Sequence, residues 1–168
     1  SGVVLIAYEQ DKPGTSSIYF DGSGDYLQDG TDEPDFEFGS GEFTAECWYN
    51  TGVTGGQWAN PIIAYGTGDA PTSSWKIYGG TYLYGYVWAG GGSTNYPVNA
   101  STATNDNSWH HVALTRDVDT LRIYIDGTQE DTADLSGITN NDAATASFYI
   151  GNDGFGTLYT GYMDEIRV

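Results

Sequence analysis

WHHVALTRDVDTLRIYIDG, residues 109–127, is the stretch of this sequence whose pattern is most typical of a single structure, a β-hairpin. Apolar residues occupy alternate positions on both sides of a short polar segment, Asp117–Thr120, that is suited to a turn. Because successive side chains of a strand point to opposite faces, this period of two places one apolar row on a buried face. The apolar row consists of Val112, Leu114, Leu121, Ile123 and Ile125. The hairpin therefore predicts an antiparallel sheet that is covered on one face.

The rest of the chain also favours short strands. It contains 24 glycines and 15% aromatic residues, and no window keeps apolar residues at helical spacing through three turns. An acidic loop is expected before residue 42, anchored by Phe36 and Phe38. Strands are expected at residues 42–50, 61–65, 75–78 and 81–88, whereas the Gly-, Ser- and Asn-rich residues 89–108 are expected to form a polar loop. These short strands predict a β-sandwich or a β-barrel.

The chain is long enough for one domain with a sizeable core, and no linker divides its body. Residues 1–15 are expected to form either a leading strand or a connection from a preceding domain. The remaining residues, 16–168, are expected to form the β domain.

Charge is strongly unbalanced along the sequence. Five basic residues accompany 23 acidic ones, and the formal net charge is −18. Such a surface repels phosphate groups, which excludes nucleic acid as a partner and disfavours anionic membranes. No apolar run is long enough to insert into a membrane. An acidic surface of this kind serves solubility or is typical of a saline or extracellular setting, and some of the carboxylates are alternatively suited to a hard cation such as calcium.

Several separated segments together resemble one family, the laminin G-like and pentraxin-like modules of the concanavalin A-like lectin/glucanase superfamily. In chain order the matching segments are residues 17–27, 38–48, 109–116, 123–127, 149–151 and 161–168. The closest likeness is to modules of bacteriophage tail and other virion proteins and of secreted bacterial proteins. The resemblance implies an all-β jelly-roll sandwich of two curved antiparallel sheets, an extracellular or virion-surface location, and other chains of a parent assembly as partners.

A calcium site is predicted near the two ends of this domain. The turn Asp21-Gly22-Ser23-Gly24-Asp25 offers closely spaced oxygen atoms, which calcium prefers as ligands. The resemblance implies that the first and last strands share a sheet, which brings Asp164 beside Asp21. Related modules carry a structural calcium ion at such a junction. The alternative is that Asp21 and Asp25 only cap a turn through bonds to the backbone.

Carbohydrate binding is the function that the aromatic residues favour. Aromatic faces stack on the C–H surfaces of sugars, and nearby polar groups bond the hydroxyls. Aromatic residues that lie in loops, or that are able to reach an open sheet face, are therefore the candidates for sugar contact. They are Trp58, Trp75, Tyr84, Trp88 and Tyr96.

Other reactive residue types are predicted to be structural. Cys47 lies in an alternating strand, which predicts a buried, inert thiol and excludes an intrachain disulfide. His110 and His111 are adjacent on a strand, so their side chains point to opposite faces and do not share a metal. With no Ser or Cys motif nearby, packing or hydrogen bonding is the favoured role of both.

An acidic motif keeps a glycoside hydrolase open as an alternative. Glu33, Asp35 and Glu37 have the E-x-D-x-E spacing that glucanases of the superfamily carry on a strand, where alternation aims the acids at one cleft. Pro34 within the motif disfavours a central strand. The favoured hypothesis is therefore a non-enzymatic module that binds cell-surface carbohydrate. The first alternative is a structural virion module without sugar binding.

Overall fold

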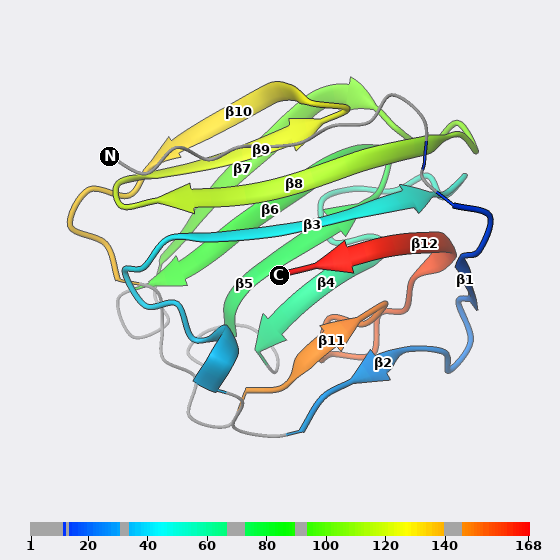
Figure 1. Cartoon of the computed structure of the whole chain (residues 1–168), viewed down its shortest axis with the longest axis horizontal. Helices are drawn as coiled ribbons and strands as arrows, with labels where there is room; N and C mark the ends of the chain where they lie inside the picture. The colour runs from blue at the N-terminus through cyan, green and yellow to red at the C-terminus, as the bar shows by residue number, and fades with distance from the viewer. Residues whose placement is uncertain (1–11, 13, 31–33, 67–72, 90–93, 140–145) are drawn as a thin grey trace.

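The structure of the protein, a computed structural model, describes residues 12, 14–30, 34–66, 73–89, 94–139 and 146–168. These residues form two six-stranded sheets that lie face to face (Figure 1). The first sheet has the strand order β1-β12-β3-β8-β9-β10, and the second has the order β2-β11-β4-β5-β6-β7. All recorded strand pairs are antiparallel, so the predicted jelly-roll sandwich is confirmed.

The described residues form a series of short strands and one 3-10 turn. The elements are β1 (Ile18–Asp21), β2 (Leu27–Gln28), η1, a 3-10 turn (Pro34–Phe36), β3 (Phe43–Asn50), β4 (Pro61–Gly66), β5 (Ser73–Gly79), β6 (Tyr82–Ala89), β7 (Thr94–Ala103), β8 (Trp109–Asp117), β9 (Thr120–Ile125), β10 (Thr128–Asp134), β11 (Phe148–Ile150) and β12 (Thr160–Arg167). The described residues include no helix with the length and apolar character that a membrane span requires.

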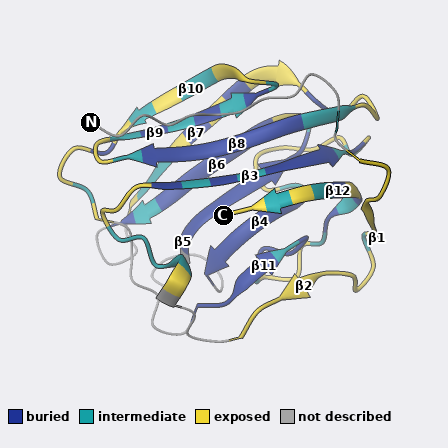
Figure 2. Ribbon diagram, in the orientation of Figure 1, coloured by how far each residue is buried: buried dark blue, intermediate teal, exposed yellow. Residues whose placement is uncertain are grey.

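Strands β8 and β9 form the predicted hairpin. Their register pairs Val112 with Ile125 and Asp117 with Thr120. Asp117 stabilises the turn, because its Oδ1 accepts a hydrogen bond from the Thr120 amide at 3.0 Å and its Oδ2 lies 2.6 Å from Arg122 Nη1. Figure 2 shows β8 buried along most of its length. The predicted apolar row of both strands is at most 3% exposed.

Aromatic rings are the largest side chains in the core between the sheets. Phe38 stacks on Phe43 of the first sheet with ring centroids 4.8 Å apart, and Phe36 stacks on Phe148 of the second at 4.2 Å. These two residues therefore anchor the segment before β3 to both sheets, as predicted. Cys47 is fully buried, and burial raises the pKa of its thiol above the ordinary value. The thiol remains protonated, which agrees with the predicted inert role.

Strand β7 corrects the prediction of a polar loop over residues 89–108. Residues Thr94–Ala103 form the edge strand of the second sheet, beside β6. Val98 and Ala100 are its buried apolar residues. Its other positions are partly or fully exposed, so apolar alternation extends over too few residues to indicate a strand.

Strand β10 closes the corresponding edge of the first sheet and contacts β7. Glu130 Oε2 accepts hydrogen bonds from the Ser101 and Thr102 amides at 3.0 Å each, and Asp131 Oδ2 accepts one from the Asn99 amide at 2.8 Å. Carboxylates of one edge thus satisfy backbone donors of the other. This arrangement protects both edges from pairing with another chain.

Candidate functional site

The outer face of the second sheet carries four neighbouring aromatic side chains. Because alternate side chains of β6 point into the core, Tyr84, Tyr86 and Trp88 point outward. Tyr78 of β5 lies opposite Tyr84 in the register, and its ring is nearly parallel to that of Tyr86 at 6.3 Å. Burial raises the pKa of Tyr84 to about 12, so its hydroxyl stays protonated. We call Tyr78, Tyr84, Tyr86 and Trp88 the aromatic row.

Trp58 belongs to the loop that joins β3 to β4, and its side chain lies across the aromatic row. Its ring meets those of Tyr84, Tyr86 and Tyr78 edge to face, with centroid distances of 5.1, 5.5 and 5.7 Å. Tyr84 and Tyr86 are only 3% and 0% exposed, whereas Trp58 is 46% exposed. Trp58 therefore presents a large apolar surface to solvent from a rigid aromatic base.

Asn60 holds the base of the loop that carries Trp58. This buried residue has a left-handed backbone, with φ of 57°, immediately before Pro61. Its Nδ2 donates to Thr51 Oγ1 at 3.0 Å, and its Oδ1 accepts from the Thr160 amide at 2.6 Å. These bonds join the two ends of the loop to β12 of the first sheet. The position of Trp58 therefore depends on both sheets.

The loop between β11 and β12 forms the wall that faces Trp58. Beneath it lies Lys76, a fully buried residue of β5 whose Nζ donates to the Asp153 carbonyl oxygen at 2.6 Å. Asp153 Oδ1 in turn accepts hydrogen bonds from the Phe155 and Thr157 amides at 2.8 and 3.0 Å. The buried cation and the internal carboxylate hold this loop in one shape, with Phe155 59% exposed.

A pocket of about 410 Å³ lies between Trp58 and this loop. Aromatic rings supply its apolar surfaces, while an amide, a hydroxyl and a backbone-bonded carboxylate supply its polar groups. A site of this composition suits a ligand that has both C–H faces and hydroxyl groups. The lining residues are Trp58, Tyr78, Trp88, Asn95, Asp153, Phe155 and Thr157.

Two of the five predicted sugar-contact residues line this pocket, and a third supports it. Trp58 and Trp88 are pocket residues. Tyr84 lies directly beneath Trp58 and is nearly inaccessible, so its part is to position the Trp58 ring.

The assignment of Trp75 as a sugar-contact residue is wrong. Its side chain is 0% exposed, and its Nε1 donates to the Phe36 carbonyl oxygen at 3.2 Å inside the core. The alternation of β5 turns Trp75 inward and Lys76 outward. Tyr96 of β7 likewise packs against the core and does not line the pocket.

The three predicted calcium ligands do not converge. Strands β1 and β12 are neighbours, as the resemblance implies, but their register places Asp21 opposite Thr160 and Ile18 opposite Met163. Asp21 and Asp164 are thus at different positions along the strand pair, and the expected juxtaposition is wrong. Asp164 pairs with Lys12, while Asp21 Oδ1 accepts a hydrogen bond from the Ser23 amide at 2.6 Å. Within the described segments, no group of three His, Cys, Asp or Glu side chains is placed to hold a metal ion.

The acidic motif does not form a strand in its described part. Glu33 lies outside the described residues, and Pro34–Phe36 form η1. Asp35 is exposed on this turn, and Glu37 Oε1 accepts a hydrogen bond from the Tyr65 hydroxyl at 3.2 Å. The expected interruption at Pro34 is confirmed, and the strand alternation that a glucanase cleft requires is missing from this segment.

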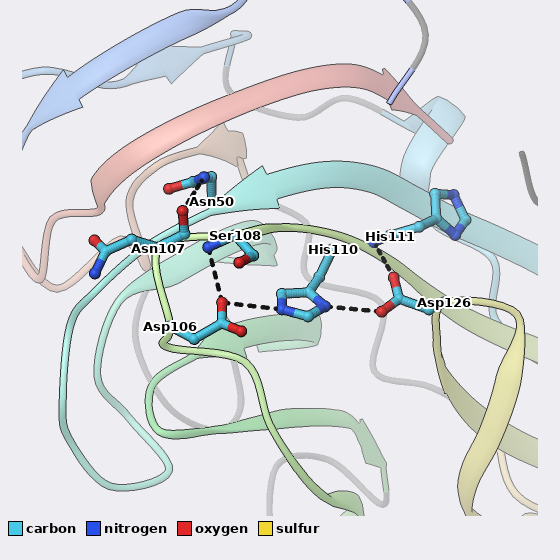
Figure 3. Close-up of polar contacts among 7 residues, drawn as sticks. All are labelled: Asn50, Asp106, Asn107, Ser108, His110, His111 and Asp126. Atoms are coloured by element: carbon cyan, nitrogen blue, oxygen red, sulfur yellow. Dashed lines mark hydrogen bonds and ion pairs between the residues drawn. The ribbon is translucent and has the colours of Figure 1, made fainter. Parts of the chain in front are cut away.

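His110 and His111 have different partners, as their adjacent strand positions predict. His110 lies between two carboxylates (Figure 3), with Nδ1 2.8 Å from Asp126 Oδ2 and Nε2 3.2 Å from Asp106 Oδ1. The His111 amide donates to Asp126 Oδ1 at 2.8 Å, while its side-chain Nε2 lies 3.5 Å from Glu46. This cluster joins the loop before β8 to the turn after β9.

The cluster predicts a pH dependence of stability. The hydrogen bond to Asp126 raises the pKa of His110 above its ordinary value, and burial offsets this only in part. Because the folded state has the higher pKa, the stabilisation by His110 is fully present below the unfolded pKa and is lost as the pH rises through the folded pKa. We expect the difference in melting temperature between the wild type and His110→Gln to shrink as the pH is raised from 5 to 9. A difference that stays constant contradicts the prediction.

At acid pH, protonation of Asp126 limits the stability that the same cluster provides. Burial acts to raise the pKa of Asp126, but hydrogen bonds from His110 and from the His111 amide outweigh it and hold the pKa below its ordinary value. Its stabilisation is therefore present above the unfolded pKa and is lost only as the pH falls through the lowered one. Comparing Asp126→Asn with the wild type at acid pH checks this limit separately.

Five pocket residues are missing from the sequence-based prediction: Tyr78, Asn95, Asp153, Phe155 and Thr157. Phe155 carries the most useful signal, because an aromatic residue between Gly154 and Gly156 is typical of a loop tip rather than of a strand. Lys76 carries no such signal, since its burial becomes evident only once the β11–β12 loop is placed over it.

Comparison with known protein families gives a match over most of the chain. Residues 21–168 match Laminin_G_3, described as concanavalin A-like lectin/glucanases superfamily. A comparison with curated proteins finds no match. The family match confirms the resemblance drawn from the separated segments.

Solved structures share the fold at low sequence identity. Laminin α1 chain domains LG4-5 from mouse are 14% identical, with a TM-score of 0.62, and the match covers 90% of this chain and 40% of that one. The CBM40 of the Ruminococcus gnavus IT-sialidase, bound to α2,3-sialyllactose, is 16% identical at a TM-score of 0.61, with coverages of 90% and 86%. Domain 4 of AbnA, a GH43 extracellular arabinanase from Geobacillus stearothermophilus in complex with arabinotriose, is 18% identical at 0.58, with coverages of 95% and 78%. This chain thus spans two fifths of the laminin fragment and most of each bacterial module.

Proposed function

Because this chain belongs to the Laminin_G_3 family of the concanavalin A-like lectin/glucanases superfamily, we propose that it is a non-catalytic module that binds an uncharged glycan in the pocket beside Trp58. The observation that carries the proposal is the half-exposed Trp58 ring, held on a buried aromatic row at the edge of a polar-lined pocket. Such a preformed aromatic surface loses little conformational freedom when a sugar ring stacks on it.

Two similar structures support a glycan as the ligand. The CBM40 of the sialidase is described with sialyllactose, and domain 4 of the arabinanase with arabinotriose. Both share the fold with this chain over most of their length. Their ligands share sugar units with hydroxyl groups and C–H faces. The aromatic and polar residues of the pocket are suited to bind such groups.

The charges favour an uncharged glycan over an acidic one. No basic side chain lines the pocket, and each of the five basic residues of the chain already has an acceptor. These acceptors are Asp164 for Lys12, the Asp153 carbonyl for Lys76, the Gly39 carbonyl for Arg116, Asp117 for Arg122 and Glu46 for Arg167. With a net charge of −18, an acidic sugar would meet repulsion without a specific counter-charge.

We place the module on an extracellular or virion surface, within a larger assembly, where it contacts cell-surface carbohydrate. A glycan array probed with the purified chain, with and without calcium, tests the binding. We expect signals from uncharged glycans that exceed those from sialylated ones. A blank array overturns the proposal and favours a structural module without sugar binding.

Calcium remains a prediction for the Asp21–Asp25 turn alone, because Asp164 is engaged by Lys12. If the ion binds there, calcium raises the melting temperature and EDTA lowers it, since a ligand of the folded state stabilises that state. Asp25→Asn is expected to weaken this response, and Asp164→Asn to leave it unchanged. The absence of any shift with either reagent contradicts the prediction.

A further inference from the structure

A second hollow lies on the same sheet face as the proposed glycan pocket. It measures about 220 Å³ and is lined by residues that include Gln57, Tyr82, Tyr84 and Asn99. Gln57 directly precedes Trp58 in the chain, and Tyr84 lies under the Trp58 ring at 5.1 Å. The Trp58 loop therefore contributes to both hollows, with Trp58 at the first and Gly55, Gly56 and Gln57 at the second.

The register of β6 and β7 relates the two hollows. Trp88 lies opposite Asn95 at the first pocket, and Tyr84 lies opposite Asn99 at the second. The two pairs are four residues apart on each strand, which corresponds to about 13 Å at roughly 3.3 Å per residue. This separation exceeds the length of one sugar ring, so a single sugar does not fill both hollows.

The second hollow repeats the chemistry of the first. Tyr82 is 52% exposed and offers an aromatic surface. Gln57 Nε2 donates to Asn99 Oδ1 at 3.1 Å, which fixes both side-chain amides at this hollow. Each hollow thus combines an exposed ring with an amide from β7. Among the described residues that line the second hollow, none is charged.

We propose that the second hollow is a subsite for the same glycan, so that the ligand is an uncharged oligosaccharide lying along β6 and β7, past the Trp58 loop. This inference rests on the proposed function, because the first pocket must bind sugar for the second to extend it. It predicts that affinity continues to rise with chain length beyond the units that the first pocket alone accommodates.

An array of uncharged arabino-, gluco-, manno- and galacto-oligosaccharides, each printed at one to six units, tests this inference with the whole chain. For every backbone that binds, the wild-type signal is expected to rise with length until both hollows are filled. Titration calorimetry on the same sugars is expected to show that Tyr82→Ala and Asn99→Ala each lower the affinity for long chains by about tenfold and that for the shortest ligands by less than about twofold.

Tyr19→Ala is the matched control, because Tyr19 is 55% exposed on the first sheet and far from either hollow in the fold. It is expected to leave the length dependence unchanged. Affinity that is independent of length, or a length dependence that persists in both Tyr82→Ala and Asn99→Ala, overturns the second subsite and leaves the proposed function standing. A wild type that binds none of the sugars overturns the proposed function itself.

Discussion

Trp58→Ala is expected to lower the affinity for the glycan by about 30-fold, which corresponds to the roughly 2 kcal/mol that a well-packed aromatic anchor contributes to an interface. The substitution removes the exposed ring and uncovers Tyr84 and Tyr86, which it shields. Because Trp58 is 46% exposed, the stability of the fold is expected to change far less than the affinity. Titration calorimetry and thermal unfolding of the same samples measure the two effects.

Trp58→Phe and Tyr162→Ala are the controls for this prediction. Phe keeps an apolar ring at the pocket and is expected to retain part of the affinity. Tyr162 is 43% exposed on the first sheet, so its loss removes an aromatic surface of similar exposure away from the pocket. An unchanged affinity in Trp58→Ala would place the glycan elsewhere on the molecule.

Trp75→Ala is expected to have the opposite effect, a large loss of stability with little change in the affinity of the protein that remains folded. Removal of a fully buried tryptophan costs about 3–5 kcal/mol through lost contacts and the cavity left behind. For a domain of this size, that loss corresponds to a fall in melting temperature of roughly 10 °C. The ring packs 5.4 Å from Phe43 and bonds the Phe36 carbonyl, so both contacts are lost together.

Trp75→Phe separates packing from the hydrogen bond. It keeps most of the apolar volume and is expected to cost clearly less than Trp75→Ala. Glycan binding measured below the melting temperature is expected to match the wild type in both variants. A loss of affinity at unchanged stability would contradict this prediction and show that Trp75 takes part in binding.

The hairpin shows why much of the fold is predictable from sequence. Val112, Leu114, Leu121, Ile123 and Ile125 occupy alternate positions on two adjacent strands, so local pattern and tertiary burial agree. In β7 the two disagree, since only Val98 and Ala100 are both apolar and buried in a ten-residue strand. That strand forms because it pairs with β6 and because carboxylates of β10 bond its amides. Neither partner is visible in the local sequence.

The candidate site is predictable to a smaller degree. Trp58 stands out as an aromatic residue in a Gly-rich loop, and Trp88 as part of an alternating aromatic strand. Asp153 and Phe155 belong to a loop more than sixty residues further along, and only the fold brings them opposite Trp88. The calcium prediction fails in its geometry for a related reason. A shared sheet does not specify register, and the register separates Asp21 from Asp164.

By itself, the sequence determined that this protein is all-β with an acidic surface, because alternation is a local property of the chain and net charge depends only on composition. The choice of a sandwich over a barrel came from the family resemblance. The sequence also determined that the chain is rich in aromatic residues suited to sugars. Only the tertiary structure decided which of them reach solvent. Alternation defines two faces of a strand but does not show which face the other sheet covers. In β5 the covered face is the one that carries Trp75, so this residue lies in the core. Trp58 became surface because Asn60 bonds its loop to Thr160, one hundred residues away in the chain.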